Sequence, residues 1–358
     1  ICSTLEAMMS ENINMLFNTI TGRRAWIKCL YNNKDISSSL EPYLKSFTYN
    51  DVISGQVDDI SLTLEDIENL WSNDWLPEKG AILTISIMTQ AWWKDNLSIE
   101  ELPLGTFEID EVEYSGPPTE VKIKGVSVPD NTELRGTEKS RAWEKVNLST
   151  IAKDIASNAS MELYYDTQEI YLERAEQSQE SDLEFLLKLC NDNGLALKIS
   201  NNQIVIFDEV DYEAKEVVDE LELKNDLIRS YSIKTKTREV YKQCHVKYKN
   251  TKENTLIEYT FLPEVNKDKN GKTLEINEEV KTTDEAERLA KKKLREKNKE
   301  EQTVSMTVYG SFFCCAGNCF TLKNFGKFDG KYILTKATHN VGSGYTCNLE
   351  LRKVLEGY

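Results

Sequence analysis

The chain has 358 residues and a formal net charge of −16, from 60 acidic and 44 basic side chains. Phosphate affinity needs a surplus of Lys and Arg, so this charge argues against a nucleic-acid binder, although nucleic acid could pass such a surface without adhering. Hydrophobic residues make up 40% and charged residues 29%, the balance of a globular protein of roughly two or three domains. No stretch reaches the ~18 consecutive apolar residues that a membrane helix needs.

Residues 1–22 are set apart as a leader to which the sequence assigns no role. They contain acids and lack a basic start followed by an apolar core, so they do not resemble a signal peptide. The eight cysteines of the whole chain are too few for a disulfide scaffold and fit a reducing compartment. Only two histidines, His245 and His339, are present, which weakens any scheme with imidazole as a catalytic base.

Residues 23–130 are predicted to form a first β domain. Apolar and polar residues alternate in the segments 25–32, 82–88, 105–114 and 119–128, as in a sheet with one solvated face. The turn Ser115–Pro118 between the last two segments predicts a hairpin.

Residues 131–209 are predicted to form a small α+β module. Ile151 and Ile155 indicate a helix near 148–159. Ser181 and Glu184 form a capping box that begins a second helix near 182–193, which ends at Gly194. Strands are expected after the helices, at 161–166, 195–200 and 203–209.

Residues 210–358 are predicted to form a second β domain. The expected strands are 228–250, 254–262, 303–310, 319–325, 331–340 and 345–354. One helix near 283–300 interrupts them, and Thr282 with Glu285 forms its capping box. Its lysines alternate with glutamates, which is typical of a solvated face.

The two β domains share a pattern. Gly105–Tyr114 aligns with Gly330–His339, so that Phe107 matches Tyr332, Ile109 matches Leu334, Val112 matches Ala337 and Tyr114 matches His339. Upstream, the segment from Gly80 aligns with the segment from Gly317, and both include a threonine, Thr84 and Thr321. The same order of matches, with a hairpin after each, favours duplication of one domain.

Three cysteines lie within six positions in the stretch Cys314–Cys319. The repeat places this stretch at the turn before Gly80 of the first copy, which predicts a turn and strand start with Gly317 supplying the permissive backbone. The alternative is a zinc or iron–sulfur site formed by Cys315, Cys319, Cys347 and Cys244, with His245 or His339 as other possible ligands. The C-C-x3-C spacing matches neither structural zinc nor ferredoxin motifs, and neighbouring chains of an oligomer could add ligands.

With these segments in place, the chain resembles the baseplate hub proteins of contractile phage tails, the late control gene D family, which is related to the hub part of type VI secretion spike proteins. The resemblance rests on residues 23–51, 54–66, 71–80, 104–118, 181–200 and 324–351, in this order along the chain. Within that family it resembles most the hubs of phages, prophages and phage-tail-like bacteriocins from Gram-positive bacteria.

The resemblance implies an α+β, mostly β fold with two tail-tube-like antiparallel β-barrel domains and a small α+β module between them. It also implies a homotrimer with pseudo-sixfold symmetry that joins the hexameric tail tube to the trimeric central spike and forms part of the tail channel. The expected partners are the tail tube protein, the central spike protein and other baseplate and tape-measure components, with DNA passing through the channel unbound. The expected location is the virion tail or baseplate, assembled in the bacterial host cytoplasm.

A tail-associated cell-wall hydrolase is the alternative function, since some tail hubs carry wall-degrading domains. Such an enzyme would use paired carboxylates, for which Asp58, Asp59, Asp110 and Glu111 are candidates. Adjacent acids on a strand point to opposite faces, so a solvated surface is the favoured interpretation and no catalytic residue or cofactor is assigned. Trp92, Trp93 and Trp71 are candidate interface anchors or core residues.

Overall fold

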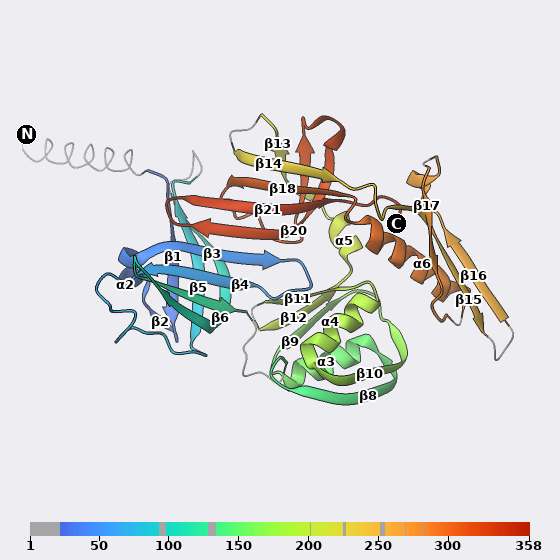
Figure 1. The fold of residues 1–358 in the computed structure, drawn as a ribbon, viewed down its shortest axis with the longest axis horizontal. Helices are drawn as coiled ribbons and strands as arrows, with labels where there is room; N and C mark the ends of the chain where they lie inside the picture. The colour runs from blue at the N-terminus through green and yellow to red at the C-terminus, as the bar shows by residue number, and fades with distance from the viewer. Residues whose placement is uncertain are drawn as a thin grey trace, which may run out of the picture. The chain divides into compact units, whose positions relative to one another are not determined.

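The computed structural model describes residues 22–92, 98–127, 134–200, 202–224, 227–250, 255–268, 270–280 and 282–358 (Figure 1). Apart from Gly22, the predicted leader therefore lies outside the described residues. The predicted mostly β fold class is confirmed, because strands far outnumber helices among the described elements. No described helix has the length and apolar character to cross a membrane.

The chain forms two compact units that do not follow simple sequence boundaries. The first covers the described residues of Ile1–Tyr49, Asp58–Asp130 and His339–Thr346, and the second covers those of Asn50–Val57, Asn131–Thr338 and Cys347–Tyr358. The predicted module and the predicted second β domain both fall mainly in the second unit, and their boundary stays a prediction.

The first sheet contains strands in which buried side chains alternate with half-buried ones. In β4, for example, Ile60, Leu62 and Leu64 are fully buried, as period-two patterning predicts. The hydrogen-bonded order is β3, β4, β7, β6, β5, β1, β2. The elements are β1 (Arg24–Tyr31), β2 (Lys34–Asp35), α2 (Ser37–Leu40), η1 (Glu41–Tyr43), β3 (Leu44–Val52), β4 (Asp59–Glu65), β5 (Ile82–Gln90), β6 (Ile99–Ser115) and β7 (Glu120–Val126).

The α+β module contains both predicted helices and more strands than the sequence indicated. α3 buries an apolar stripe that includes Ile151 and Ile155, and α4 begins with the predicted capping box. β8 pairs antiparallel with β10, while β11, β12 and β9 form a separate sheet. The elements are β8 (Glu138–Asn147), α3 (Leu148–Asn158), β9 (Glu162–Asp166), β10 (Tyr171–Ser181), α4 (Asp182–Asp192), β11 (Ala196–Ser200), β12 (Gln203–Phe207) and α5 (Glu209–Ala214).

The second sheet has the same strand order as the first. β14, β18, β21 and β20 are consecutive neighbours, β19 lies beside β20, and β13 lies beside β19. The elements are β13 (Val217–Glu222), β14 (Ile228–Thr235), β18 (Gln302–Tyr309), β19 (Cys319–Lys323), η3 (Gly326–Phe328), β20 (Gly330–Val341) and β21 (Tyr345–Lys353). The order β3, β4, β7, β6, β5 in the first sheet thus corresponds to β14, β18, β21, β20, β19 in the second.

One outer strand breaks this correspondence. β1 runs antiparallel to β5, whereas β13 runs parallel to β19. A parallel neighbour needs a long crossover connection, and the chain between β13 and β19, which contains β14 and β18, provides it.

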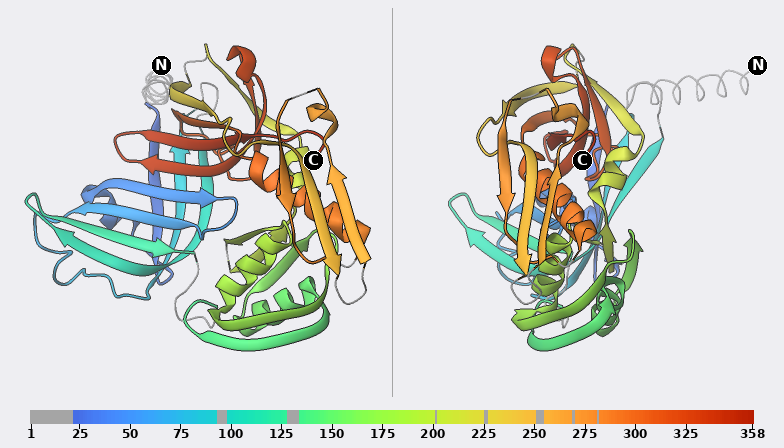
Figure 2. Two further views of the ribbon diagram at one scale, coloured as in Figure 1. Left: turned by 45° about the vertical axis from the view of Figure 1, so that its right-hand side comes forward. Right: turned by 90° about the vertical axis from the view of Figure 1, so that its right-hand side faces the viewer.

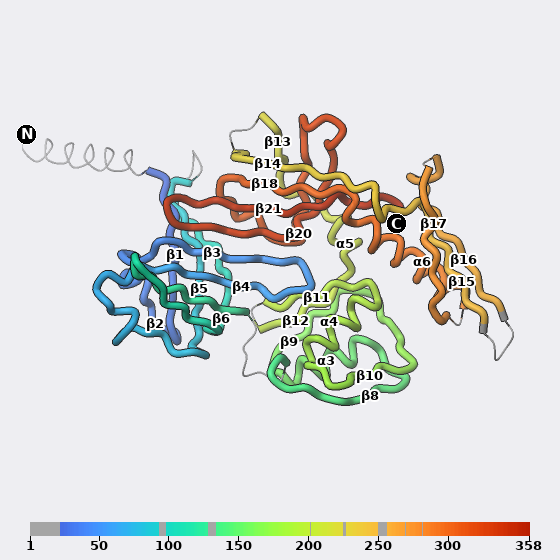
Figure 3. Tube along the Cα trace, viewed as in Figure 1, coloured from blue at the N-terminus to red at the C-terminus, as the bar shows by residue number. Residues whose placement is uncertain are grey.

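A small α/β insertion separates β14 from β18, and the chain returns from it through α6 (Figure 3). The predicted single strand 228–250 is therefore wrong, because β14 and β15 belong to different sheets. The chain turns between them, where Glu239 has a φ of 66°. The elements are β15 (Tyr241–Asn250), β16 (Thr255–Phe261), η2 (Glu264–Asn266), β17 (Lys272–Ile276) and α6 (Thr283–Asn298).

The insertion has its own core. α6 lies along one face of the sheet β16–β15–β17 (Figure 2). Ala286, Ala290 and Leu294 pack there against Cys244 and Val246 of β15. The predicted apolar side of the helix is thus buried against the insertion and not against the second repeated sheet.

Candidate functional site

The cysteine-rich turn repeats the backbone geometry of the turn before β5. Gly80 N donates to Ile109 O over 2.9 Å, and Gly317 N donates to Leu334 O over 2.8 Å. Ile109 N in turn donates to Ala81 O and Leu334 N donates to Asn318 O, both over 2.9 Å. These are the residue pairs that the sequence repeat aligned.

The strand register after each turn also agrees. Leu83 faces Phe107 and Thr84 faces Thr106 in the first sheet, while Phe320 faces Tyr332 and Thr321 faces Lys331 in the second. The four aligned glycines, Gly80, Gly105, Gly317 and Gly330, all have positive φ. The predicted internal repeat is therefore confirmed in this part of the two sheets.

The match weakens towards the end of the aligned strands. Tyr114 is 51% exposed, whereas its counterpart His339 is buried and shares a 2.7 Å hydrogen bond between Nδ1 and the Tyr345 hydroxyl. The ring centroids of His339 and Tyr49 are 5.8 Å apart. Sequence alignment alone could not foresee this difference, since it depends on what lies next to each strand.

The cysteines of the turn point to different neighbours. The Cys315 thiol donates to Phe312 O over 3.3 Å within the turn. The Cys319 thiol donates to Tyr212 O over 3.4 Å and packs in a core with Ile53 and Ile333. The Cys315 thiol thus has an acceptor within the turn, whereas the Cys319 thiol has one in α5.

Of the other two candidate metal ligands, Cys347 lies beside the turn and Cys244 lies away from it. Cys244 is buried in the core of the insertion, and Cys347 interacts with Cys314. Within the described ranges, no group of three or more His, Cys, Asp or Glu side chains has the arrangement of a metal site. A metal shared between chains stays a prediction that elemental analysis can test.

Burial raises the pKa of several cysteine thiols of the chain. It raises the pKa of Cys190 to about 12 and, with nearby Glu275 and Glu278, the pKa of Cys244 to about 11. The hydrogen bond with Cys347, together with burial, raises the pKa of Cys314 well above its usual range. Since the thiolate is the reactive and metal-binding form, these environments favour packing over chemistry. Cys29 and Cys190 are core residues, as their sequence patterns predicted.

A buried carboxylate anchors the cysteine-rich turn from the end of β3. Asp51 is 5% exposed, and its Oδ2 accepts a hydrogen bond from Ala316 N over 2.7 Å. Its other oxygen pairs with the Lys198 ammonium of β11, which also donates to Val52 O over 3.0 Å. Asp51, at the end of β3, therefore connects to the turn through a hydrogen bond and to the module strand β11 through an ion pair. Sequence patterning gave no sign of this contact, because the residues lie far apart in the chain.

A second buried ion network surrounds α5. Arg352 of β21 is 2% exposed and pairs with Glu209 over 2.6 Å and with Glu213. Arg295 of α6 donates to Glu213 over 2.5 Å. Burial disfavours the charged form of Glu209, but the cations Arg352, Lys299 and Arg295 lower the pKa of its carboxyl overall. This network links α5, the insertion helix and the second sheet.

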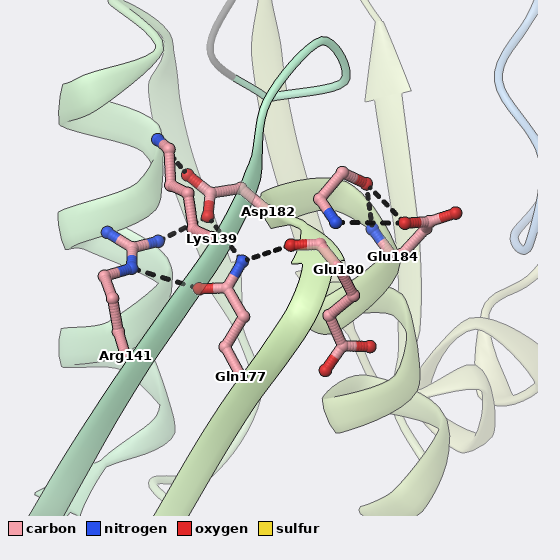
Figure 4. A network of polar contacts seen from close by, with 7 residues as sticks. Lys139, Arg141, Gln177, Glu180, Asp182 and Glu184 are labelled. Atoms are coloured by element: carbon pink, nitrogen blue, oxygen red, sulfur yellow. Dashed lines mark hydrogen bonds and ion pairs between the residues drawn. The ribbon is translucent and has the colours of Figure 1, made fainter.

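A third network lies at the start of α4 (Figure 4). Asp182 is 1% exposed and accepts hydrogen bonds from Lys139 over 2.9 Å and Gln177 over 2.8 Å, as well as from Arg141. Gln177 Nε2 also donates to Glu180 O over 2.9 Å. The helix is thereby fixed to the β8–β10 ribbon.

The carboxylates considered for hydrolysis have dissimilar surroundings. Asp58 is 1% exposed and accepts a hydrogen bond from the Tyr49 hydroxyl over 3.2 Å. Glu111 is exposed and pairs with Lys124 over 2.6 Å, which lowers the pKa of Glu111. Asp59 lies in β4 and Asp110 is exposed in β6. Surface and structural roles account for these contacts.

Of the three candidate tryptophan anchors, Trp71 and Trp92 are buried and Trp93 is not among the described residues. Trp92 is buried and its ring centroid lies 5.5 Å from that of Tyr345. Trp71 is buried and contacts the more exposed Trp75 edge-on, with 5.4 Å between centroids. Trp93 lies outside the described residues. Trp75, which the sequence analysis did not single out, is the tryptophan of this cluster that reaches the surface.

Residues 128–345 match the model of a family described as the phage tail baseplate hub. The chain belongs to the phage tail baseplate hub family. This confirms the resemblance found in the sequence, and it identifies the chain as a component of a phage tail or baseplate.

The probable baseplate hub protein of Escherichia phage P2 is 29% identical to this chain over 181 residues. The alignment spans 49% of this chain and 43% of the phage protein, so it covers less than half of that relative's length.

Two solved structures are similar in fold to this chain over nearly its whole length. The 43 kDa tail protein of prophage MuSo2 from Shewanella oneidensis is 13% identical, with a TM-score of 0.70 over 92% of this chain and 98% of that one. A component of the Escherichia coli type VI secretion system, itself reported as similar to T4 tail proteins, is 12% identical, with a TM-score of 0.55 over 94% and 78% of the two chains. Both likenesses concern the fold.

Proposed function

We propose that three copies of this chain assemble into the hub that joins the hexameric tail tube to the trimeric central spike. The observation that carries the proposal is the shared hydrogen-bond frame of the two sheets, from Gly80 to Ile109 and from Gly317 to Leu334. Two equivalent sheets per chain become six in a trimer. Such an assembly can meet a sixfold partner on one side and a threefold partner on the other.

The buried ion networks support a structural role. Lys198–Asp51 and Arg352–Glu209 link elements that are more than a hundred residues apart in the chain. Breaking a buried pair leaves an uncompensated charge, so each network resists loosening of the joint that it spans. A hub that joins the tube to the spike needs such fixed connections between its parts.

The net charge of −16 suits a channel component. Acidic side chains repel phosphates, so DNA would pass an acidic lumen without adhering. The tail tube, the spike and the tape-measure components are the partners that this role requires, and assembly would take place in the host cytoplasm.

Mass photometry of the purified chain across a concentration series, with a peptidoglycan-release assay on the same sample, tests the proposal. We expect a trimer and no release above buffer. A chain that stays monomeric at every concentration and releases peptidoglycan fragments would instead support the cell-wall hydrolase.

A further inference from the structure

Residues 335–340 of β20 form hydrogen bonds with residues 48–53, at the end of β3. Ile53 N donates to Thr335 O over 3.0 Å, and Thr338 Oγ1 donates to Asn50 Oδ1 over 2.7 Å. Thr48 Oγ1 donates to Asn340 Oδ1 over 3.3 Å. Residue numbers rise along one segment as they fall along the other, so residues 48–53 run antiparallel to residues 335–340. We call this arrangement the β3–β20 seam.

The repeat places residues 110–115 of β6 where β20 carries residues 335–340. These β6 residues pair with β7, from Glu111 opposite Lys124 to Ser115 opposite Glu120. The pairing of β6 with β5 ends at Glu108, and no other described strand lies along the remaining edge. The side chains of Asp110, Glu111, Glu113 and Tyr114 are exposed. In the first sheet, the edge of residues 110–115 that corresponds to the seam therefore has no described strand paired with it.

β14 is the counterpart of β3 in strand order and is an outer strand. In the described part of the chain it pairs with β18 alone (Figure 1). Six of its eight residues are exposed, and Tyr231 is 48% exposed. An outer strand of this length presents a row of backbone donors and acceptors to another chain.

The two edges have opposite charges. Residues 228–238 contain Arg229, Lys234, Lys236 and Arg238 and no acid. Residues 110–115 contain three acids and no base. Opposite-charge pairs across neighbouring strands stabilise a sheet, and like-charge pairs destabilise it. Each edge would repel a second copy of itself and attract the other.

We propose that β14 of one chain adds antiparallel to residues 110–115 of β6 in a second chain. This interchain seam repeats between chains the β3–β20 seam that each chain makes internally, and three chains close the ring. The inference rests on the trimer proposed above, and it names the strands that hold the trimer together. Main-chain hydrogen bonds supply the attachment, and the charges select the partner edge.

Cysteine cross-linking tests this seam. Glu113→Cys is combined in turn with Ser230→Cys, Tyr231→Cys, Ser232→Cys, Ile233→Cys and Lys234→Cys, which samples both faces of β14. Cross-strand cysteines that face each other meet the distance that a disulfide needs, and those on opposite faces do not. We expect mild oxidation to give interchain disulfides in one or two of the five variants, with products that end at the trimer. One control is each variant with a single added cysteine. The other is the double variant Ser232→Cys/Glu176→Cys, because Glu176 is exposed in β10, away from the proposed seam.

The outcomes separate the seam from the trimer. A trimer by mass photometry in which none of the five variants cross-links would overturn the seam and leave the proposed function standing. A chain that stays monomeric without cross-links would overturn both, and would mean that the cations of β14 simply prevent edge pairing.

A charge exchange provides a second readout that does not depend on oxidation. Lys234→Glu places an acid opposite the acidic β6 edge, so we expect the trimer to weaken by about tenfold or more. Adding Glu113→Lys should restore it. Failure of the second change to restore a trimer weakened by the first would contradict the pairing.

Discussion

At the scale of single residues, Gly80 and Gly317 have the same backbone role but different neighbours. Their φ values are +81° and +91°, a region that side chains rarely adopt. A Cβ at Gly80 would lie 3.7 Å from Glu108 Oε1, a flexible side chain, whereas one at Gly317 would lie 3.2 Å from the Tyr212 ring. The two positions therefore form a matched pair for mutagenesis.

We expect Gly80→Ala to lower the free energy of unfolding by about 1–2 kcal/mol through backbone strain. Gly317→Ala should lower the free energy of unfolding by about 1–3 kcal/mol more than Gly80→Ala does, because its Cβ also crowds the Tyr212 ring. Urea titration measures both, and Gly344→Ala, with open space around its Cβ, is the control. Equal effects at Gly80 and Gly317 would mean that the packing around Tyr212 does not constrain the cysteine-rich turn.

His245 is expected to make the stability of the insertion depend on pH. Its Nδ1 lies 2.8 Å from Glu275 and its Nε2 lies 2.7 Å from Glu258, so three strands meet at one imidazole. The hydrogen bond with Glu275 first, and then that with Glu258, raises the pKa of His245 above 6.5. The protonated ring is therefore more stable in the folded chain. Its contribution is fully present below pH 6.5 and is lost as pH rises through the raised pKa.

We expect His245→Gln to lower the melting temperature at pH 6 and to change it much less at pH 9.5. The effect should be a few degrees at most, because both glutamates are largely exposed. Differential scanning fluorimetry of both proteins across this range measures the difference. A constant difference from pH 6 to 9.5 would show that the imidazole acts by shape alone.

At the scale of elements, the Asp182 network determines how α4 is attached to its ribbon. Asp182→Asn would leave Lys139 and Arg141 without a buried counter-charge, so we expect a loss of about 3–5 kcal/mol in the free energy of unfolding. Glu176→Gln removes the exposed pair with Arg174 on the same ribbon and should cost less than about 1 kcal/mol. Urea unfolding followed by circular dichroism compares the two. Similar small losses would mean that water reaches Asp182.

The elements that could be predicted are those with a local signal. α4 begins at the Ser181–Glu184 capping box, and the turn glycines of the repeat have the expected conformations. β8 and β10 carry many charges and no clean alternation, because each packs against a single partner strand. The Asp51–Lys198 and Arg352–Glu209 pairs were not predictable, since their partners come from distant segments. The cysteine-rich turn was predicted correctly as a turn because the first copy supplied a template.

At the scale of the whole molecule, the proposed trimer would use the duplicated sheet to match a sixfold partner. The α+β module and the insertion have no counterpart among the described residues of the first copy, so a trimer would contain each of them three times. A tube-facing surface made from the repeated sheets and a spike-facing surface made from the unique parts would reconcile the two symmetries.

A cryo-EM map of the assembled tail tip tests this account most directly. The account predicts three copies of the chain, with the sheets of β3–β7 and β14–β21 alternating as six similar units around one channel. A ring with another number of copies, or one in which the two sheets occupy dissimilar positions relative to the axis, would contradict it.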